Sequence, residues 1–148
     1  MSLKATITED MKSAMRAKDA TRLSTIRMLL AAIKQKEVDE RIEVTDSDVV
    51  GIIDKMIKQR RESVAQFDAG GRPELAAAER AEIDLLQGYM PQPLSEGELD
   101  TLIASTIAGS GVSGMAAMGK VMATLKPQIA GRADMAKVSA KVKAKLAG

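Results

Sequence analysis

The sequence predicts an all-α protein, and three observations support this fold class. Apolar residues recur at intervals of three and four along the chain, which is the period of one helix face. Residues that favour helices are abundant, whereas aromatic residues amount to only 1% of the chain. No segment of any length shows the alternation of apolar and polar residues that predicts a half-buried strand. The cores must therefore be built from Leu, Ile, Val, Ala and ten Met.

Four helices are expected in the first 90 residues, over residues 3–18, 20–41, 46–69 and 73–88. Asp19 is a suitable N-cap for the second helix, and Thr45 with Asp48 resembles a capping box for the third. Gly70-Gly71 ends the third helix, because glycine adopts the left-handed conformation that closes a helix, and Pro73 suits the first turn of the fourth. The positions expected to face inward include Leu3, Ile7, Met11, Met15, Leu23, Ile26, Leu30, Ile33, Leu75, Ile83 and Leu86.

A domain boundary is expected at Pro91-Gln92-Pro93, because two prolines in this spacing cannot continue a helix and favour an extended linker. The chain is thereby divided into an N-terminal four-helix domain (1–90), a linker (91–94) and a small C-terminal three-helix domain (95–148). Ser95 with Glu98 forms a capping box that begins the fifth helix, and Asp134 is a fair N-cap for the last. The three helices are expected over about 96–108, from Met115 to near Pro127, and from 135 onward, with Met115, Met118, Met122 and Leu125 facing inward in the sixth.

The absence of Cys and His narrows the chemistry open to this chain. Disulfides, thiolate nucleophiles and Cys-based metal sites are excluded, and the usual general base near neutral pH is missing. We therefore expect no catalytic residue, no cofactor and no metal site. The N-terminus lacks the apolar segment of a signal peptide, and no stretch approaches the roughly 20 apolar residues of a membrane span. A soluble cytoplasmic protein with no membrane partner is expected.

The charge is strongly polarised along the chain, although the net charge is only +2. Residues 119–148 carry seven basic side chains and one acid, whereas the preceding 118 residues carry 15 basic and 19 acidic side chains. A basic segment at the end of a mildly acidic body predicts a polyanionic partner, with RNA first. The candidate nucleic-acid-binding residues are Lys120, Lys126, Arg132, Lys137, Lys141 and Lys145.

Three of these lysines, Lys137, Lys141 and Lys145, are four residues apart and form one line along the last helix. The line is either a phosphate-binding ridge or a solvated face that maintains solubility, and both interpretations remain open. If RNA binds here, residues 91–148 offer no aromatic side chain on which bases could stack. Recognition would then depend on phosphate charge and helical shape, so binding should be salt-sensitive. Reversal of Lys137 and Lys141 to Glu is expected to abolish binding while helicity is retained.

Three other features favour structural roles. Gly114–Lys120 matches the first seven positions of a phosphate-binding P-loop, but Val121 replaces the Ser or Thr that follows and no strand precedes it. Tyr89 is expected to pack at the domain junction and to find a hydrogen-bond partner. A second basic set is expected mainly to form ion pairs with Glu62, Glu79, Glu82 and Asp84, which are less favoured as catalytic carboxylates or cation ligands. That set comprises Arg27, Lys34, Lys55, Lys58, Arg60 and Arg61.

Three stretches of the chain form a joint pattern. They are Asp10–Asp19 with Arg22–Leu29 and Ala31–Lys34; Lys58–Ser63 with Gln66-Phe67, Glu79, Glu82-Ile83 and Tyr89–Pro91; and Met118–Met122 with Gly131–Asp134 and Val138. Together these stretches resemble the GatB/YqeY family, specifically a stand-alone YqeY-like protein. The joint pattern is specific, and the resemblance covers nearly the whole chain.

The resemblance implies a tail domain similar to the C-terminal domain of the B subunit of the tRNA-dependent amidotransferase, where that domain contacts tRNA. The matching positions are Gly119, Val121, Met122, Gly131, Ala133 and the basic helix that follows. The catalytic domains of that enzyme have no counterpart here, so a tRNA-binding accessory protein is expected. Two alternatives stay open. One is a module that docks on a synthetase or amidotransferase component, and the other, by family similarity only, is a carbon–nitrogen ligase with glutamine as amido-N-donor.

Overall fold

The computed structural model describes residues 1–147, and within them the expected all-α fold is confirmed, with no strand. The chain forms two compact units, Met1–Met90 (unit 1) and Pro91–Gly148 (unit 2). None of the described helices combines the length and apolarity needed to cross a membrane. The helices are α1 (Leu3–Arg16), α2 (Ala20–Glu40), α3 (Asp46–Ala69), α4 (Pro73–Gln87), α5 (Glu96–Gly109), α6 (Met118–Ile129) and α7 (Met135–Ala147), with a 3-10 turn at Met115–Ala117 before α6.

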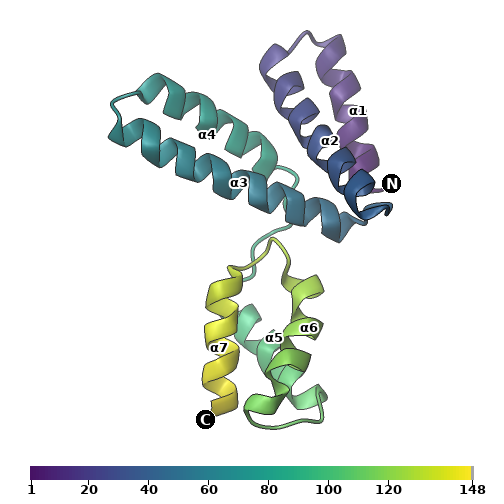
Figure 1. The fold of residues 1–148 in the computed structure, drawn as a ribbon, viewed down its shortest axis with the longest axis vertical. Coiled ribbons are helices and arrows are strands. Elements are labelled where there is room, and N and C mark those ends of the chain that lie inside the picture. The colour runs from purple at the N-terminus through teal and green to yellow at the C-terminus, as the bar shows by residue number, and fades with distance from the viewer. Residues whose placement is uncertain (148) are drawn as a thin grey trace. The chain divides into compact units, whose positions relative to one another are not determined.

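Unit 1 consists of two helical hairpins, α1 with α2 and α3 with α4 (Figure 1). They share one core where the first half of α3 meets the other three helices. This core is almost entirely aliphatic, as the composition requires, and Tyr89 is the aromatic residue packed against it. Its buried members are Ile7, Ala14, Ile26, Leu29, Ile33, Val49, Ile53, Met56, Ile57 and Leu86.

The expected capping box at the start of α3 is present. The Thr45 hydroxyl accepts a hydrogen bond from the Asp48 amide at 3.1 Å, and the Asp48 carboxylate accepts one from the Thr45 amide at 2.9 Å. The bond from the Thr45 amide lowers the pKa of Asp48. At the other end, Gly71 has a positive φ of 71°, a conformation that glycine adopts without steric cost. Local sequence therefore determines both ends of the longest helix.

Unit 2 packs α5, α6 and α7 around a second aliphatic core. The Ser95 hydroxyl caps α5 by accepting a hydrogen bond from the Glu98 amide at 3.1 Å. The turn from α6 to α7 passes through Gly131, with φ 71°, and the Asp134 carboxylate accepts a hydrogen bond from the Ala136 amide at 2.9 Å. The buried residues of this core are Leu99, Ile103, Ala117, Val121, Leu125, Ile129, Val138, Val142 and Leu146.

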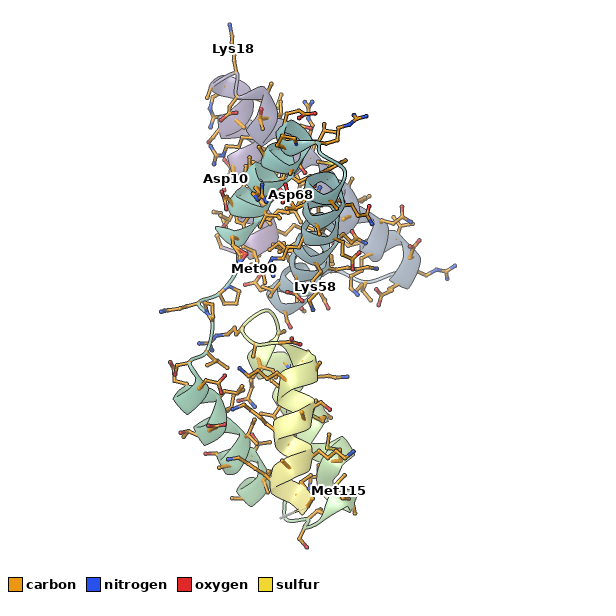
Figure 2. The ribbon with its side chains drawn as sticks, turned by 90° about the vertical axis from the view of Figure 1, so that its left-hand side faces the viewer. Asp10, Lys18, Lys58, Asp68, Met90 and Met115 are labelled. Carbon is orange, nitrogen blue, oxygen red and sulfur yellow. The ribbon has the colours of Figure 1, made fainter. Side chains whose placement is uncertain are left out.

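Three apolar residues expected in the cores are instead exposed. Met15 is exposed because positions four apart rotate about 40° per step around a helix, so that Ala14, seven residues after Ile7, is buried in its place. Leu75 is exposed because α4 is rotated so that its neighbour Ala76 is the fully buried position. Met115 lies in the 3-10 turn rather than in α6, and its side chain is at the surface (Figure 2).

The sixth helix also extends past Pro127, which was expected to stop it. Proline removes one backbone donor, but α6 continues to Ile129. Ile129 is fully buried in the core of unit 2, and the Ala130 amide donates to the Lys126 carbonyl at 3.0 Å. Packing of the last turn therefore outweighs the missing hydrogen bond.

Tyr89 fastens the end of unit 1 back onto its first helix. Its hydroxyl donates to the Asp10 carboxylate at 2.6 Å across 79 residues of sequence. Burial, and next the hydrogen bond to Asp10, raise the pKa of Tyr89, so the phenol stays protonated as a donor at neutral pH. Tyr89 packs against the core of unit 1, and its hydroxyl has a hydrogen-bond partner as expected.

Replacement of Tyr89 by Phe should lower the free energy of unfolding of unit 1 by about 1–2 kcal/mol, because a half-buried carboxylate loses its donor. Urea denaturation of the full chain, followed by circular dichroism, measures the change. Asp10→Asn, which keeps an acceptor oxygen, should cost less. Equal stability of Tyr89→Phe and the wild type would show that the bond does not fasten the two ends.

Candidate nucleic-acid interface

The line of lysines on α7 lies beside its buried stripe and faces acids of α5. The buried positions Val138, Val142 and Leu146 fix the rotation of α7, which leaves the lysines on one flank of the helix. Lys137 and Lys141 both form ion pairs with Glu96, and Lys141 also reaches Asp100 at 2.8 Å. The Lys145 ammonium donates to the backbone carbonyl of Asp100 at 3.4 Å. The α5–α7 cluster, formed by three ion pairs and the hydrogen bond of Lys145, thus consists of Glu96, Asp100, Lys137, Lys141 and Lys145.

The cluster changes the acidity of its members. The hydrogen bond from Lys137, and next that from Lys141, holds the pKa of Glu96 at about 2. The hydrogen bond to Asp100, and next that to Glu96, raises the pKa of Lys141. Lys141 is the least accessible of the pairing lysines, with its side chain 23% exposed against 56% for Lys137. Lys137 is therefore better placed than Lys141 to reach a second anion.

Two other candidate residues bind backbone carbonyls and hold loops. The Lys120 ammonium donates to the Ser110 carbonyl at 2.6 Å, at the end of α5, where helix carbonyls lack internal partners. The Arg132 guanidinium donates to the Gln92 carbonyl at 2.8 Å, and the Leu94 amide donates to the Arg132 carbonyl at 2.9 Å. Both cations therefore stabilise the fold of unit 2.

Lys126 differs from the other candidates. It is exposed on α6, and its ammonium has no hydrogen-bond or ion-pair partner among residues 1–147. Lys143 on α7, which was not among the candidates, has the same properties. Of the six candidates, the structure therefore joins three in one cluster, assigns two to loops and leaves one exposed.

The acids of α5 are the residues that sequence reasoning missed. Glu96 and Asp100 precede Gly119, so they lie outside the basic segment 119–148 that the sequence singles out. A usable signal was present, because these two acids are four residues apart on one helix and Lys137 and Lys141 are four apart on another. With the acids of residues 91–118 included, unit 2 has seven basic and four acidic side chains.

The second basic set is paired only in part. Arg60 donates to Glu82 at 2.8 Å, and Lys58 pairs with Asp54 at 3.1 Å. No ion pair involves Arg27 or Lys34 within the part of the chain that the structure describes. In the same residues, no group of three or more acids could hold a metal ion.

The segment that partly matches a P-loop also has a structural role. It follows the helix α5 and not a strand, and it contains the 3-10 turn Met115–Ala117. Its lysine, Lys120, is bonded to the Ser110 carbonyl. Both features differ from a nucleotide-binding loop, which follows a strand and directs its lysine at phosphates.

Comparison with known proteins identifies the family. The model of a family described as "Yqey-like protein" matches residues 4–146. The chain belongs to this family. This match confirms the resemblance to YqeY-like proteins over nearly the whole chain.

Several fungal proteins are similar to this Yqey-like chain, and each is named "Altered inheritance of mitochondria protein 41, mitochondrial". The protein of Pyrenophora tritici-repentis is 35% identical over 83% of this chain and 68% of its own length. That of Eremothecium gossypii is 45% identical over 58% of this chain and 48% of its own length. That of Saccharomyces cerevisiae (strain YJM789) is 38% identical over 62% and 50%. The chain thus spans about half the length of the latter two relatives. Their mitochondrial names overturn the cytoplasmic location expected from the sequence.

The ion pairs of Glu96 predict a specific dependence of stability on pH. Its folded pKa of about 2 lies below the value of about 4.3 for an unfolded Glu, so the pairs stabilise unit 2 above pH 4.3 and lose this effect as the pH falls toward 2. The wild type should therefore melt at a higher temperature than Glu96→Gln at about pH 6, and the gap should close on acidification.

Differential scanning calorimetry of the full chain over this pH range measures the gap. Glu98→Gln is the matched control, because Glu98 is exposed on the same helix and forms no ion pair in the described residues. A gap for Glu96→Gln that did not change with pH, or one that Glu98→Gln reproduced, would contradict the assignment.

Proposed function

We propose that this chain is an accessory RNA-binding protein that recognises tRNA, or RNA of similar structure, through unit 2. The observation that carries the proposal is the charge of α7, which has four lysines and no acid over Met135–Ala147. Exposed Lys126 on α6 adds a fifth cation. The resemblance of this segment to the tRNA-contacting tail of the amidotransferase B subunit supports the same function. A role beside tRNA-dependent amide formation, or in another step of tRNA metabolism, follows from it.

The ion pairs of α7 are compatible with this proposal. Lys137 and Glu96 are both more than half exposed, and solvent and salt screen such pairs strongly. A phosphate offers an ammonium group the same kind of charged oxygen acceptor as a carboxylate. An RNA backbone also releases condensed counterions when cations neutralise it, which drives the exchange. Lys137 and Lys145 would thus bind phosphate by giving up internal partners, whereas Lys126 and Lys143 would bind without this cost.

The side chains of unit 2 determine how it would bind RNA. Residues 91–148 contain no aromatic side chain, so unstacked bases find no platform there. Lysines on two helices can meet phosphates on a folded RNA whose backbone has a fixed shape. Binding should therefore depend strongly on salt and weakly on base sequence. We also propose that residues 1–90 and 95–148 act as separate domains joined by the linker at 91–94.

The geometry changes the choice of test variant. Reversal of Lys137 and Lys141 to Glu would place two further carboxylates beside Glu96 and Asp100, so a failure to bind could reflect a disrupted fold. Neutral replacement of Lys126 and Lys143 removes two charges that no described partner uses. The double variant Lys126→Gln/Lys143→Gln therefore tests binding with the fold preserved.

Lys126→Gln/Lys143→Gln should weaken tRNA binding and reduce the slope of log affinity against log salt by about 2, one unit for each phosphate that the variant no longer neutralises. Fluorescence anisotropy of labelled bulk tRNA with the full chain across a salt series measures both quantities. The matched control is Lys18→Gln/Lys55→Gln, which removes the same charge from exposed lysines of unit 1 that form no ion pair in the described residues. An unchanged slope for Lys126→Gln/Lys143→Gln, or an equal reduction in the control, would refute the proposed interface.

A further inference from the structure

The outward side of α2 is apolar and basic, and it is covered by no other described element. Its residues follow one another at spacings of four and three, which keeps them on one side of the helix, opposite Ile26, Leu29 and Ile33 in the core. All six are exposed. We call this set the α2 outer face: Ala20, Ser24, Arg27, Ala31, Lys34 and Val38.

This face exposes more apolar surface than a solvated helix requires. Val38 is 59% exposed, and Met28, at the edge of the face, is 40% exposed. A surface helix normally confines its apolar residues to the stripe that faces the core. In α2, by contrast, apolar residues lie on both the inner and the outer side. An amphipathic partner that covered the outer side would remove this surface from water.

A groove of about 460 Å³ runs along the N-terminal half of this face. Small side chains at Ala20, Ser24 and Ala31 form its floor, and the larger Leu23, Arg27 and Met28 rise beside them. Every lining residue belongs to one helix, so the groove is an open trough and not an enclosed pocket. A trough of this kind fits the ridge of side chains on another helix.

The charges of the face indicate the chemistry of that helix. Arg27 and Lys34 are exposed and form no ion pair within residues 1–147, and the α2 outer face contains no acid. They are seven residues apart, which places them on the same side at a separation of about 10 Å along the axis. Beyond Met28, Arg60 approaches the Met28 sulfur at 3.6 Å, but its charge is already paired with Glu82. Arg27 thus borders the trough, and Lys34 lies beyond its end on the same side of α2.

From this arrangement we propose that the α2 outer face docks an amphipathic helix of a partner protein, with apolar residues in the trough and two acids about seven residues apart that meet Arg27 and Lys34. The same face of a second copy does not fit, because in either orientation Arg27 and Lys34 of one copy would oppose Arg27 or Lys34 of the other. The exposed apolar residues also distinguish the face from unit 2, where the proposed interface is charged. The inference is independent of RNA binding by unit 2.

A pair of synthetic helical peptides tests the proposal on the full chain. One peptide has Leu and Ala on one face and Glu at two positions seven residues apart, and the other is identical except for Lys at those positions. The protein variants are Arg27→Glu/Lys34→Glu and a matched control, Lys55→Glu/Arg61→Glu, which makes the same charge change at exposed positions of α3 without described ion pairs. Fluorescence anisotropy of labelled peptides gives the affinities.

The wild type and the control should prefer the Glu peptide over the Lys peptide by about tenfold or more, since opposed like charges disfavour docking. Arg27→Glu/Lys34→Glu should reverse that preference. Ala31→Gln, which lengthens a side chain on the trough floor without adding charge, should weaken the binding of both peptides. Failure of the Glu peptide to bind the wild type, or an equal change of preference in the control, would overturn the proposal. A third result would also overturn the proposal: Arg27→Glu/Lys34→Glu loses affinity for tRNA, and the wild type does not bind the Glu peptide. The α2 outer face would then bind nucleic acid and not a protein helix.

Discussion

The ion pairs between α5 and α7 determine how the basic end of this chain can act. Glu96 bridges Lys137 and Lys141, and Asp100 holds Lys141 from the next turn of α5. Because these acids lie about 40 residues before their partners in sequence, the lysines are dense along the chain but partly neutralised in space. The same contacts join two helices across the surface of a small aliphatic core. A polyanion that bound unit 2, as we propose, would therefore compete with carboxylates for some lysines and meet others that have no partner in the described residues.

In unit 1 the relation between the charges in sequence and their pairing in the fold is reversed. Its sequence is nearly balanced in charge, with 15 basic and 16 acidic side chains in residues 1–90. Even so, Arg27 and Lys34 form no ion pair in the described chain, and Glu82, one of the acids expected to pair with this set, is paired with Arg60. Nearly equal numbers of acidic and basic residues in a sequence thus do not predict that each cation has an ion-pair partner in the fold. In this protein a bound partner is best sought where cations and apolar surface coincide without a compensating acid.

The fold class was predictable from sequence because its determinants are local. Helix periodicity, the Thr45–Asp48 capping box and the glycines after α3 act within a few residues, and they place most helix ends correctly. The failures have tertiary causes. Met15 follows a spacing that turns away from the core, and Pro127 stays in a helix that a buried Ile129 holds in place. The partners of Lys120 and Arg132 are backbone carbonyls, which a side-chain pattern cannot reveal. The candidate site was therefore predicted as a region, whereas the separate roles of its lysines required the structure.

The competition between carboxylates and phosphates is tested most directly by the tRNA affinity of Glu96→Gln. This change removes the acceptor shared by Lys137 and Lys141 and leaves both cations in place. The affinity of the full chain for tRNA should rise severalfold above that of Asp134→Asn, which removes one acid from the same unit and retains a side chain able to cap α7. Equal affinities of the two variants would show that the loss of any acid from unit 2 strengthens tRNA binding, with no specific competition at Glu96. A lower affinity for Glu96→Gln than for the wild type would contradict the view that these lysines exchange an internal carboxylate for RNA phosphate.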